Sequence, residues 1–201
     1  MADDITVHLI RHEKTKANME RKYIGWTDEP IQKKVVAEID LQPAIVYGSD
    51  LRRCRETAQC YFPDAEFIAS RDLRELHFGD FEMCTYEQLQ HNGTYRAWID
   101  DPLNNPIPNG ETFLQFQQRV LNDFREIVYE NKEYTFIVHG GVIRLLLAVY
   151  GLEEQSFQQT VANHRTIYTL GWNSVDELIG GARCTLYSEA HITVNENMQK
   201  N

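Results

Sequence analysis

Three arginines stand close together in the sequence RRCR, at positions 52–55. They follow the residues SDL at 49–51, which have the composition of a turn. The planar guanidinium group of arginine matches the oxygens of a phosphate or a carboxylate with two parallel hydrogen bonds. The cluster therefore favours a pocket that binds an oxyanion. A solvated helix face, on which the arginines form salt bridges, is the competing interpretation.

Two histidines each follow a run of apolar residues. His12 follows Arg11 at the end of the run TVHLI. His139 follows the run TFIV and precedes Gly140 and a second glycine. Glycine lets the backbone approach a ligand closely, and successive backbone N–H groups can bind an anion. Neutral imidazole is itself a nucleophile at neutral pH, so the pattern favours chemistry on a phosphate.

A metal site is the rival interpretation of these histidines. Neither lies in an HxH or HExxH pattern or has a carboxylate partner at the spacing of metal ligands. We therefore predict neither a metal nor another cofactor. The cysteines form no CxxC pattern and are expected to be free thiols in a reducing compartment; they are Cys54, Cys60, Cys84 and Cys184. The histidines expected to be ordinary polar or packed residues are His8, His77, His91, His164 and His191.

The elements that must position these residues alternate between strands and helices. This alternation predicts a single α/β domain over residues 1–201, a three-layer sandwich with a mostly parallel central sheet flanked by helices. Ligands of such sheets bind beyond the carboxyl ends of the strands, where Arg11, His12 and His139 fall. Strands are predicted at 6–10, 45–47, 135–138, 166–172 and 177–186, the last two around a turn at 173–176. Helical patterns lie at 54–62, 111–130 and 142–150, with a helix start at 70–76.

Composition and charge limit the classes of function. The chain has 201 residues, 20 of them basic and 30 acidic, for a net charge of −10. This balance disfavours binding to nucleic acid or to an anionic membrane and favours a small-molecule substrate. The N-terminal sequence MADDI lacks the features of a signal peptide, and the most apolar segment, 142–152, is too short to span a membrane. We expect a soluble, cytoplasmic protein, and a homodimer is left open.

Four segments, in order along the chain, resemble the motifs of the histidine phosphatase (phosphoglycerate mutase-like) superfamily. Residues 9–18 (LIRHEKTKAN) are similar to its RHG/RHxxTxxN signature, and 49–58 (SDLRRCRETA) to its SDLxRxxxTA element. Residues 73–82 (LRELHFGDFE) resemble its LxExxxGxxEG element, and 138–141 (VHGG) its second-histidine element. Four blocks in the right order over most of the chain are not expected by chance.

The resemblance implies a role for each matching residue. His12 would accept the phosphoryl group as the nucleophile, with Arg11, Arg53 and His139 around that group. Glu75 would donate a proton to the leaving group. Phosphoryl transfer needs mainly positioning and charge stabilisation, so this set requires no metal. The residues expected to contact the substrate or its phosphate are Asn18, Gly25 and Gly140.

Two residues depart from the pattern of the superfamily. Glu13 replaces the glycine that usually follows the nucleophile, and Met83 replaces the glycine after Glu82. A carboxylate that pointed into a phosphate pocket would repel the substrate, so Glu13 is expected to turn outward or to tune specificity. Neither departure removes a group that the chemistry needs. Arg144, in the apolar helix after His139, is expected to be a structural ion-pair partner.

The middle of the chain resembles the α-ribazole phosphatase branch of the superfamily and its relatives. Residues 95–120 follow the pattern YxxWxxDP…PxGEs…F..RV, and 23–31 (YIGWTDEPI) fit the same group. Within this stretch, the Pro-rich segment 101–110 is expected to be a loop that serves as a lid or pocket wall, with Tyr95 and Trp98 packed beside it.

The predicted function is a metal-independent phosphatase that hydrolyses small phosphomonoesters through a phosphohistidine. The substrate is left open between α-ribazole phosphate and the phosphates of sugars, small acids or nucleotides. A phosphoglycerate mutase-type isomerase is one alternative, but mutases carry longer insertions over the active site, for which 201 residues leave little room. A phosphate-binding regulatory module with little turnover is the other alternative, and the complete set of catalytic groups argues against it.

Overall fold

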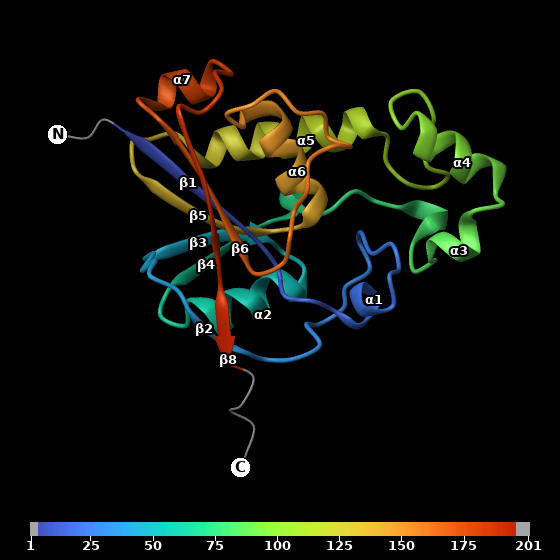
Figure 1. Ribbon diagram of the computed structural model, residues 1–201, viewed down its shortest axis with the longest axis horizontal. Helices are drawn as coiled ribbons and strands as arrows, with labels where there is room; N and C mark the ends of the chain where they lie inside the picture. The colour runs from blue at the N-terminus through green and yellow to red at the C-terminus, as the bar shows by residue number, and fades with distance from the viewer. Residues whose placement is uncertain (1–3, 196–201) are drawn as a thin grey trace, which may run out of the picture.

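A six-stranded sheet forms the centre of the computed structural model, which describes residues 4–195 (Figure 1). Its strands, in spatial order, are β4 (Glu66–Ser70), β3 (Ile45–Ser49), β5 (Glu133–Val138), β1 (Ile5–Arg11), β6 (Thr166–Trp172) and β7 (Leu186–His191). The first four strands in this order are parallel to one another, whereas β6 and β7 are antiparallel to their neighbours. A short second sheet pairs β2 (Val36–Glu38) with β8 (Thr193–Asn195).

The helices cover both faces of the sheet. Successive residues of a strand point to opposite faces, and in β1 Ile10 packs against α2 (Arg52–Tyr61) while Leu9 packs on the other side. That other side is covered by α5 (Phe113–Ile127) and α6 (Gly140–Tyr150), which lie together above the sheet in Figure 1. The predicted three-layer α/β sandwich with a mostly parallel sheet is confirmed.

Three of the shorter helices lie beyond one end of the sheet (Figure 1). α1 (Lys16–Met19), α3 (Tyr86–Leu89) and α4 (Gly93–Asp100) lie on the right in Figure 1. Two short 3₁₀ turns, η1 (Arg71–Leu73) and η2 (Gly79–Phe81), precede α3.

An aromatic cluster holds this region together. Its members are Tyr23, Phe78, Phe81, Tyr95 and Trp98, in mutual ring contact. Tyr95, expected beside a pocket wall, is wholly buried in this cluster, and its hydroxyl group is hydrogen bonded to that of Tyr23 at 2.6 Å. The two aromatic residues therefore serve the packing of this region.

Two details of the predicted elements are corrected by the structure. The strand predicted at 177–186 is wrong, because α7 (Val175–Ile179) occupies its start and β7 begins only at Leu186. Ser174 caps this helix by accepting a hydrogen bond from the Glu177 N–H, a signal that the sequence contains. The helix start predicted at 70–76 is limited to the single turn η1. Met83 adopts a φ of 60°, in the left-handed region that favours glycine, so it keeps the usual turn at a conformational cost.

Two expectations from the sequence were that the MADDI start lacks the features of a signal peptide and that no segment is long enough to span a membrane. Met1, Ala2 and Asp3 of the MADDI sequence lie outside the described residues. Among the helices of residues 4–195, none is both long and apolar enough to cross a membrane.

Candidate active site

The two predicted histidines lie side by side at the carboxyl edge of the sheet. In the parallel pair of β1 and β5, Arg11 is opposite Val138, so His12 and His139 leave the two strands at the same level. Their ring centroids are 5.1 Å apart, and the rings meet edge to face. The two residues are 2% and 1% exposed, so the protein surrounds both imidazoles.

His12 is held as a neutral imidazole with a defined tautomer. Its Nδ1 lies 2.7 Å from the carbonyl oxygen of Glu13. Because a carbonyl oxygen can only accept, the proton is on Nδ1 and the Nε2 lone pair is free. Burial, reinforced by the charges of Arg53 and Arg11, holds the pKa of His12 well below its usual value. An unprotonated Nε2 in this setting has the properties of a nucleophile.

Arg53 connects His139 to the loop around Gly25. Its Nε donates to Nδ1 of His139 at 3.2 Å, and its two terminal nitrogens donate to the carbonyl oxygens of Thr27 (2.9 Å) and Gly25 (2.6 Å). Burial, followed by the charge of Arg53, also lowers the pKa of His139 well below its usual value. The second imidazole is therefore neutral, and the guanidinium group beside it is fixed in place.

The sequence left two interpretations of the arginine cluster, an oxyanion pocket and a solvated helix face. The structure places one arginine in the first setting and the other two outside it. Arg53 is fully buried and faces the histidines. Arg52 forms an exposed salt bridge with Glu56 at 3.0 Å, and the guanidinium group of Arg55 lies over the Phe67 ring. Only the middle arginine thus belongs to the oxyanion pocket.

Arg11 supplies a second guanidinium group to the same place. One terminal nitrogen donates to the Ala162 carbonyl oxygen at 2.7 Å, while the buried Nε has no hydrogen-bond partner within the described residues. Gly140 leaves room for this side chain, since a Cβ atom there would lie 3.0 Å from the guanidinium carbon. A buried donor without a partner favours an anionic ligand at this position.

Glu75 faces the start of α6 with its carboxylate. One oxygen accepts a hydrogen bond from the Gly141 N–H at 2.8 Å, and the other accepts from the Leu76 N–H at 2.9 Å. Any side chain at position 141 would collide with this carboxylate, which explains the second glycine after His139. The carboxylate is therefore held by backbone N–H groups, one of them two residues along the chain from His139, and forms no salt bridge within residues 4–195.

Arg119 fixes the backbone that carries Glu75, a role that sequence reasoning missed. It donates to the carbonyl oxygens of Asp72 and Arg74, both at 2.8 Å, and of Glu75 at 2.9 Å. Its Nε and second terminal nitrogen are paired with the carboxylate of Glu111. The signal in the sequence was the pattern PxGE…F..RV, which contains both members of this pair.

Asn18 and Gly25 have partners in the protein as well. The side-chain oxygen of Asn18 accepts from the Thr15 N–H at 3.1 Å in a capping box at the start of α1, which leaves the amide nitrogen available to bind phosphate. The N–H of Gly25 donates to Glu82 at 3.0 Å, and its carbonyl oxygen binds Arg53. Gly25 therefore supports Arg53 rather than offering a free N–H to a substrate.

Glu13 was expected to turn outward or to tune specificity, and its side chain is buried in the protein rather than exposed to solvent. It is only 4% exposed, and its carboxylate accepts hydrogen bonds from the Tyr61 hydroxyl group and from Nε of Arg165, the latter at 2.9 Å. The carboxylate is thus directed away from the histidines and into the protein, between α2 and the start of β6.

Two further expectations made from the sequence are wrong. His164 is not an ordinary histidine, because its ring lies 5.7 Å from that of His12 and its Nδ1 donates to the His12 carbonyl oxygen at 2.8 Å. Burial lowers the pKa of His164 to about 3. Arg144 forms no ion pair within the described residues; it donates twice to the Phe157 carbonyl oxygen and lies over the Phe157 ring at 4.3 Å.

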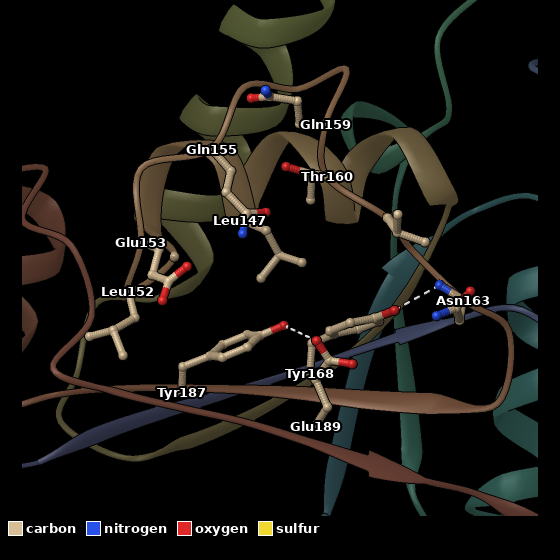
Figure 2. A pocket seen from close by; sticks show the side chains of 12 residues that line it. Leu147, Leu152, Glu153, Gln155, Gln159, Thr160, Asn163, Tyr168, Tyr187 and Glu189 are labelled. Atoms are coloured by element: carbon tan, nitrogen blue, oxygen red, sulfur yellow. Dashed lines mark hydrogen bonds between the residues drawn. The ribbon is translucent and has the colours of Figure 1, made fainter.

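Among the cavities beside the segment that leads into β6, two differ in whether they reach the site. One, of about 440 Å³, contains none of the predicted site residues among its described lining (Figure 2). Figure 2 shows the Tyr168 hydroxyl group accepting a hydrogen bond from the Asn163 N–H, at 2.7 Å, at one end of this cavity. The other cavity, of about 430 Å³, is lined by Arg11 and His164 and so reaches the site itself.

The arrangement as a whole is suited to phosphoryl transfer. A neutral imidazole nucleophile lies beside two guanidinium groups and a second neutral imidazole, and a carboxylate is held nearby. Within residues 4–195, no group of three or more His, Cys, Asp or Glu side chains is placed to hold a metal ion. The charged and polar donors present are of the kind that binds phosphoryl oxygens.

Known proteins resemble the chain over most of its length. The adenosylcobalamin/alpha-ribazole phosphatase of Escherichia coli (strain K12) is 30% identical over 158 residues, covering 70% of this chain and 76% of that protein. Phosphoglycerate mutase-like protein 4 of Arabidopsis thaliana is 30% identical over 161 residues, covering 72% of this chain and 70% of that protein. The crystal structure of the alpha-ribazole phosphatase from Shigella flexneri matches with a TM-score of 0.69 at 26% identity, over 82% of this chain and 89% of that chain.

The family follows from these likenesses and from the match of a family model. The model of the histidine phosphatase superfamily (branch 1) matches residues 7–178, which include both histidines, Arg53 and Glu75. The relatives are phosphatases and a mutase-like protein, so the chain is a phosphatase or a mutase. This chain belongs to the histidine phosphatase superfamily, branch 1.

Proposed function

We propose that the chain hydrolyses small phosphomonoesters through a phosphohistidine at His12. The observation that supports this most is the neutral His12, with its Nδ1 proton bound to a carbonyl oxygen and the charges of Arg11 and Arg53 beside it. Nε2 attacks phosphorus, and the bond from phosphorus to the leaving oxygen breaks. Glu75 acts as the general acid and gives a proton to that oxygen.

Attack by water completes the proposed cycle. The Glu75 carboxylate left by the first step takes a proton from a water molecule as the water oxygen attacks phosphorus. The phosphorus–nitrogen bond breaks, its electron pair returns to Nε2 of His12, and inorganic phosphate leaves. Glu75 is then protonated again, ready for the next substrate.

The phosphoryl oxygens receive donors from several elements. Arg11 offers its Nε, which has no partner among the described residues, and Arg53 is bonded to His139, whose ring lies beside that of His12. The Gly140 N–H begins α6, where a helix has no internal partner for it, and the Asn18 amide can add a further bond. These donors are charged or prearranged, so the proposed reaction needs neither a metal nor another cofactor.

Hydrolysis is favoured over isomerisation, and the substrate is a small phosphorylated molecule. A mutase must retain its intermediate for return transfer under a substantial cap, and a chain of 201 residues has little room for one. The names of the Escherichia coli and Shigella flexneri relatives make α-ribazole phosphate the first candidate, with sugar and acid phosphates next.

A panel of phosphomonoesters tests this proposal. It includes α-ribazole phosphate, 3-phosphoglycerate and p-nitrophenyl phosphate, each with and without EDTA. We expect release of inorganic phosphate that EDTA leaves unchanged and that vanadate inhibits, because vanadate mimics five-coordinate phosphorus. Conversion of 3-phosphoglycerate to 2-phosphoglycerate without phosphate release would establish a mutase instead. Phosphate binding without turnover of any substrate would indicate a regulatory module.

We also propose that residues 1–201 act as one catalytic domain in the cytoplasm. The first and last strands of the central sheet come from opposite ends of the chain, and the described site draws on residues 11 to 165. Cys54, Cys60, Cys84 and Cys184 are free thiols, as expected in a reducing compartment.

A further inference from the structure

Glu13 occupies the position where the superfamily pattern has glycine, directly after the proposed nucleophile. All its polar groups have partners. Its N–H donates to the Thr57 hydroxyl oxygen at 2.8 Å, and its carbonyl oxygen accepts the Nδ1 proton of His12 at 2.7 Å. Its carboxylate binds Tyr61 and Arg165. The backbone of this residue thus touches the nucleophile, while its side chain is attached elsewhere.

The carboxylate of Glu13 is attached to two separate elements. Tyr61 is the last residue of α2, and Arg165 lies just before β6. Arg165 contacts both carboxylate oxygens, at 2.9 Å and 3.3 Å. A buried carboxylate is stable only when it is paired and hydrogen bonded, so moving this side chain out of its place would be costly. The side chain therefore anchors residue 13 to the core on both sides.

A glycine at this position has no such anchor. The carbonyl oxygen of residue 13 could then turn more easily, because only the backbone bonds on either side of its peptide would remain, from the N–H of residue 13 to Thr57 and from the Gln32 N–H to the Lys14 carbonyl oxygen. The Nδ1–H bond of His12 depends on that carbonyl oxygen. Without a fixed acceptor, the imidazole can carry its proton on Nε2, and this tautomer has no lone pair with which to attack phosphorus.

We propose that Glu13 is a positioning residue, whose buried carboxylate, held by Tyr61 and Arg165, fixes the carbonyl oxygen that keeps His12 in its nucleophilic tautomer. The assignment rests on the proposed function of His12 as the nucleophile. It gives the departure from glycine a role in catalysis without any contact between Glu13 and the substrate.

The first test measures the tautomer directly and needs no substrate. The nitrogen chemical shifts of the His12 imidazole, assigned with His12→Asn, are compared in the wild type, Tyr61→Phe, Glu13→Gln and Glu13→Ala. We expect a single Nδ1–H tautomer in the wild type. Glu13→Ala is expected to give a mixture of the Nδ1–H and Nε2–H tautomers. Tyr61→Phe should contain a smaller share of the Nε2–H tautomer than Glu13→Ala does. Glu13→Gln should contain the smallest share of the three, because its amide oxygen can still accept from Tyr61.

The matched control is Tyr134→Phe. Tyr134 is as buried as Tyr61, and its hydroxyl group is hydrogen bonded to the backbone of Glu130, near the start of β5 and far from His139. Both substitutions remove one buried hydroxyl group and are expected to lower stability to a similar degree. Only Tyr61→Phe is expected to change the imidazole shifts of His12.

The second test measures single-turnover formation of the phosphoenzyme. A small misplacement of a reacting group typically costs up to about 10²-fold in rate. We expect a loss of about 10²-fold for Glu13→Ala and about 10-fold for Tyr61→Phe, with Glu13→Gln near the wild type. The Kd for inorganic phosphate should change by less than about threefold, because Arg11 and Arg53 stay in place and phosphate forms no bond to Nε2.

The outcomes separate this inference from the proposed function. Wild-type His12 tautomer shifts in both Glu13→Ala and Tyr61→Phe would overturn the positioning role, whether or not the enzyme turns over. Equal losses of phosphorylation in Tyr61→Phe and Tyr134→Phe would also overturn it, since they would reflect stability alone. Absence of a phosphoenzyme in the wild type would instead reject the proposed function, while the tautomer measurement still decides the role of Glu13.

Discussion

The two halves of the site are held in different ways. The half around His12 is built on the sheet itself: His12 and His139 leave adjacent buried strands, and Arg53 stands in the first turn of a packed helix. The half around Glu75 lies in a loop after the 3₁₀ turn η1, and it is held by the Gly141 N–H and by Arg119. One half is rigid because of the core, and the other because of a clamp of hydrogen bonds.

This difference has a consequence for the chemistry of the two halves. The phosphoryl group is common to every substrate, and the part that would bind it is fixed by the interior of the fold. The leaving group differs from substrate to substrate, and the part that would protonate it is held by side chains that can vary without damage to the core. Substitutions in the half around His12 should therefore lower the rate equally for all substrates. For substitutions in the half around Glu75, the loss of rate should depend on the leaving group.

The largest effect is expected from His12→Ala, in the half around the nucleophile. Loss of a covalent nucleophile has cost on the order of 10⁶-fold in kcat in well-studied hydrolases. We expect no labelled phosphoenzyme after a rapid quench with labelled substrate, for alkyl and aryl phosphates alike. The thermal midpoint serves as the control for folding. Substantial turnover in this variant would show that the nucleophile lies elsewhere.

The next largest effect is expected from Glu75→Gln, in the other half. An alkoxide leaving group needs a proton as its bond to phosphorus breaks, whereas p-nitrophenolate leaves readily without one. Phosphoenzyme formation should fall by on the order of 10² to 10⁴ for alkyl phosphates and far less for p-nitrophenyl phosphate. With the aryl substrate, a burst followed by slow turnover is expected, because water attack also uses this carboxylate. Equal losses for both substrates would contradict the division between the halves.

The next effect in size is expected from His139→Ala, in the half around the nucleophile. Loss of one donor to a charged transition state typically costs about 10² to 10³ in rate. The loss should be the same for alkyl and aryl phosphates, and it is measured as the single-turnover rate with each. A loss confined to alkyl phosphates would place His139 with the proton donor instead.

Whether a residue of the site could be predicted from the sequence depended on which groups form its contacts. His12, Arg53 and His139 could be predicted because each stands in a local motif at the end of a strand or the start of a helix. His164 could not, because its place beside His12 results from the antiparallel course of β6, which brings residues before that strand back to the carboxyl edge. Arg119 was missed because its partners are mostly carbonyl oxygens, which every residue has.

The fold itself was predictable where apolar runs are long and buried. β1, β5 and β6 match the runs of the sequence because both faces of each strand are covered. The predicted strand at 177–186 failed because a short apolar pattern fits a strand or a helix equally well. There the cap at Ser174 decided the outcome, since it favours a helix start over a continued turn.

The pH dependence of stability should also come from the half around the nucleophile. Burial lowers the pKa of His12, His139 and His164 in the folded state, so the unfolded chain binds more protons below its own histidine pKa of about 6.5. The contribution of these histidines to the free energy of unfolding should therefore be greatest above that pH. It should fall as the pH drops below it, by up to about 1.4 kcal/mol per pH unit for each histidine. Urea unfolding at pH 7, 6 and 5 measures this slope, and His164→Asn should reduce it by up to about 1.4 kcal/mol per pH unit. A flat profile would mean that these imidazoles take up protons in the folded protein as readily as in the unfolded chain.

The smallest effect is expected from Arg119→Lys, and it is the sharpest test of the clamp. Lysine keeps the positive charge beside Glu111 but cannot reach three carbonyl oxygens and a carboxylate at once, since its ammonium group lacks the planar fork. The loop that carries Glu75 should then loosen, and the proton donor should be misplaced only part of the time, with a loss of about 10-fold for alkyl phosphates. The rate with p-nitrophenyl phosphate should change little, as in Glu75→Gln.

Arg125→Lys, on the same helix, is the matched control for this substitution. Arg125 donates to the Tyr150 hydroxyl group at 2.9 Å and has no contact with the Glu75 loop among the described residues. It should lose some stability and keep the ratio of alkyl to aryl rates of the wild type. A general loosening of the fold would lower both rates in both variants, whereas a clamp on the acid changes the ratio in Arg119→Lys alone. An unchanged ratio in Arg119→Lys would mean that the Gly141 N–H suffices to hold Glu75, and that both halves of the site depend on the core.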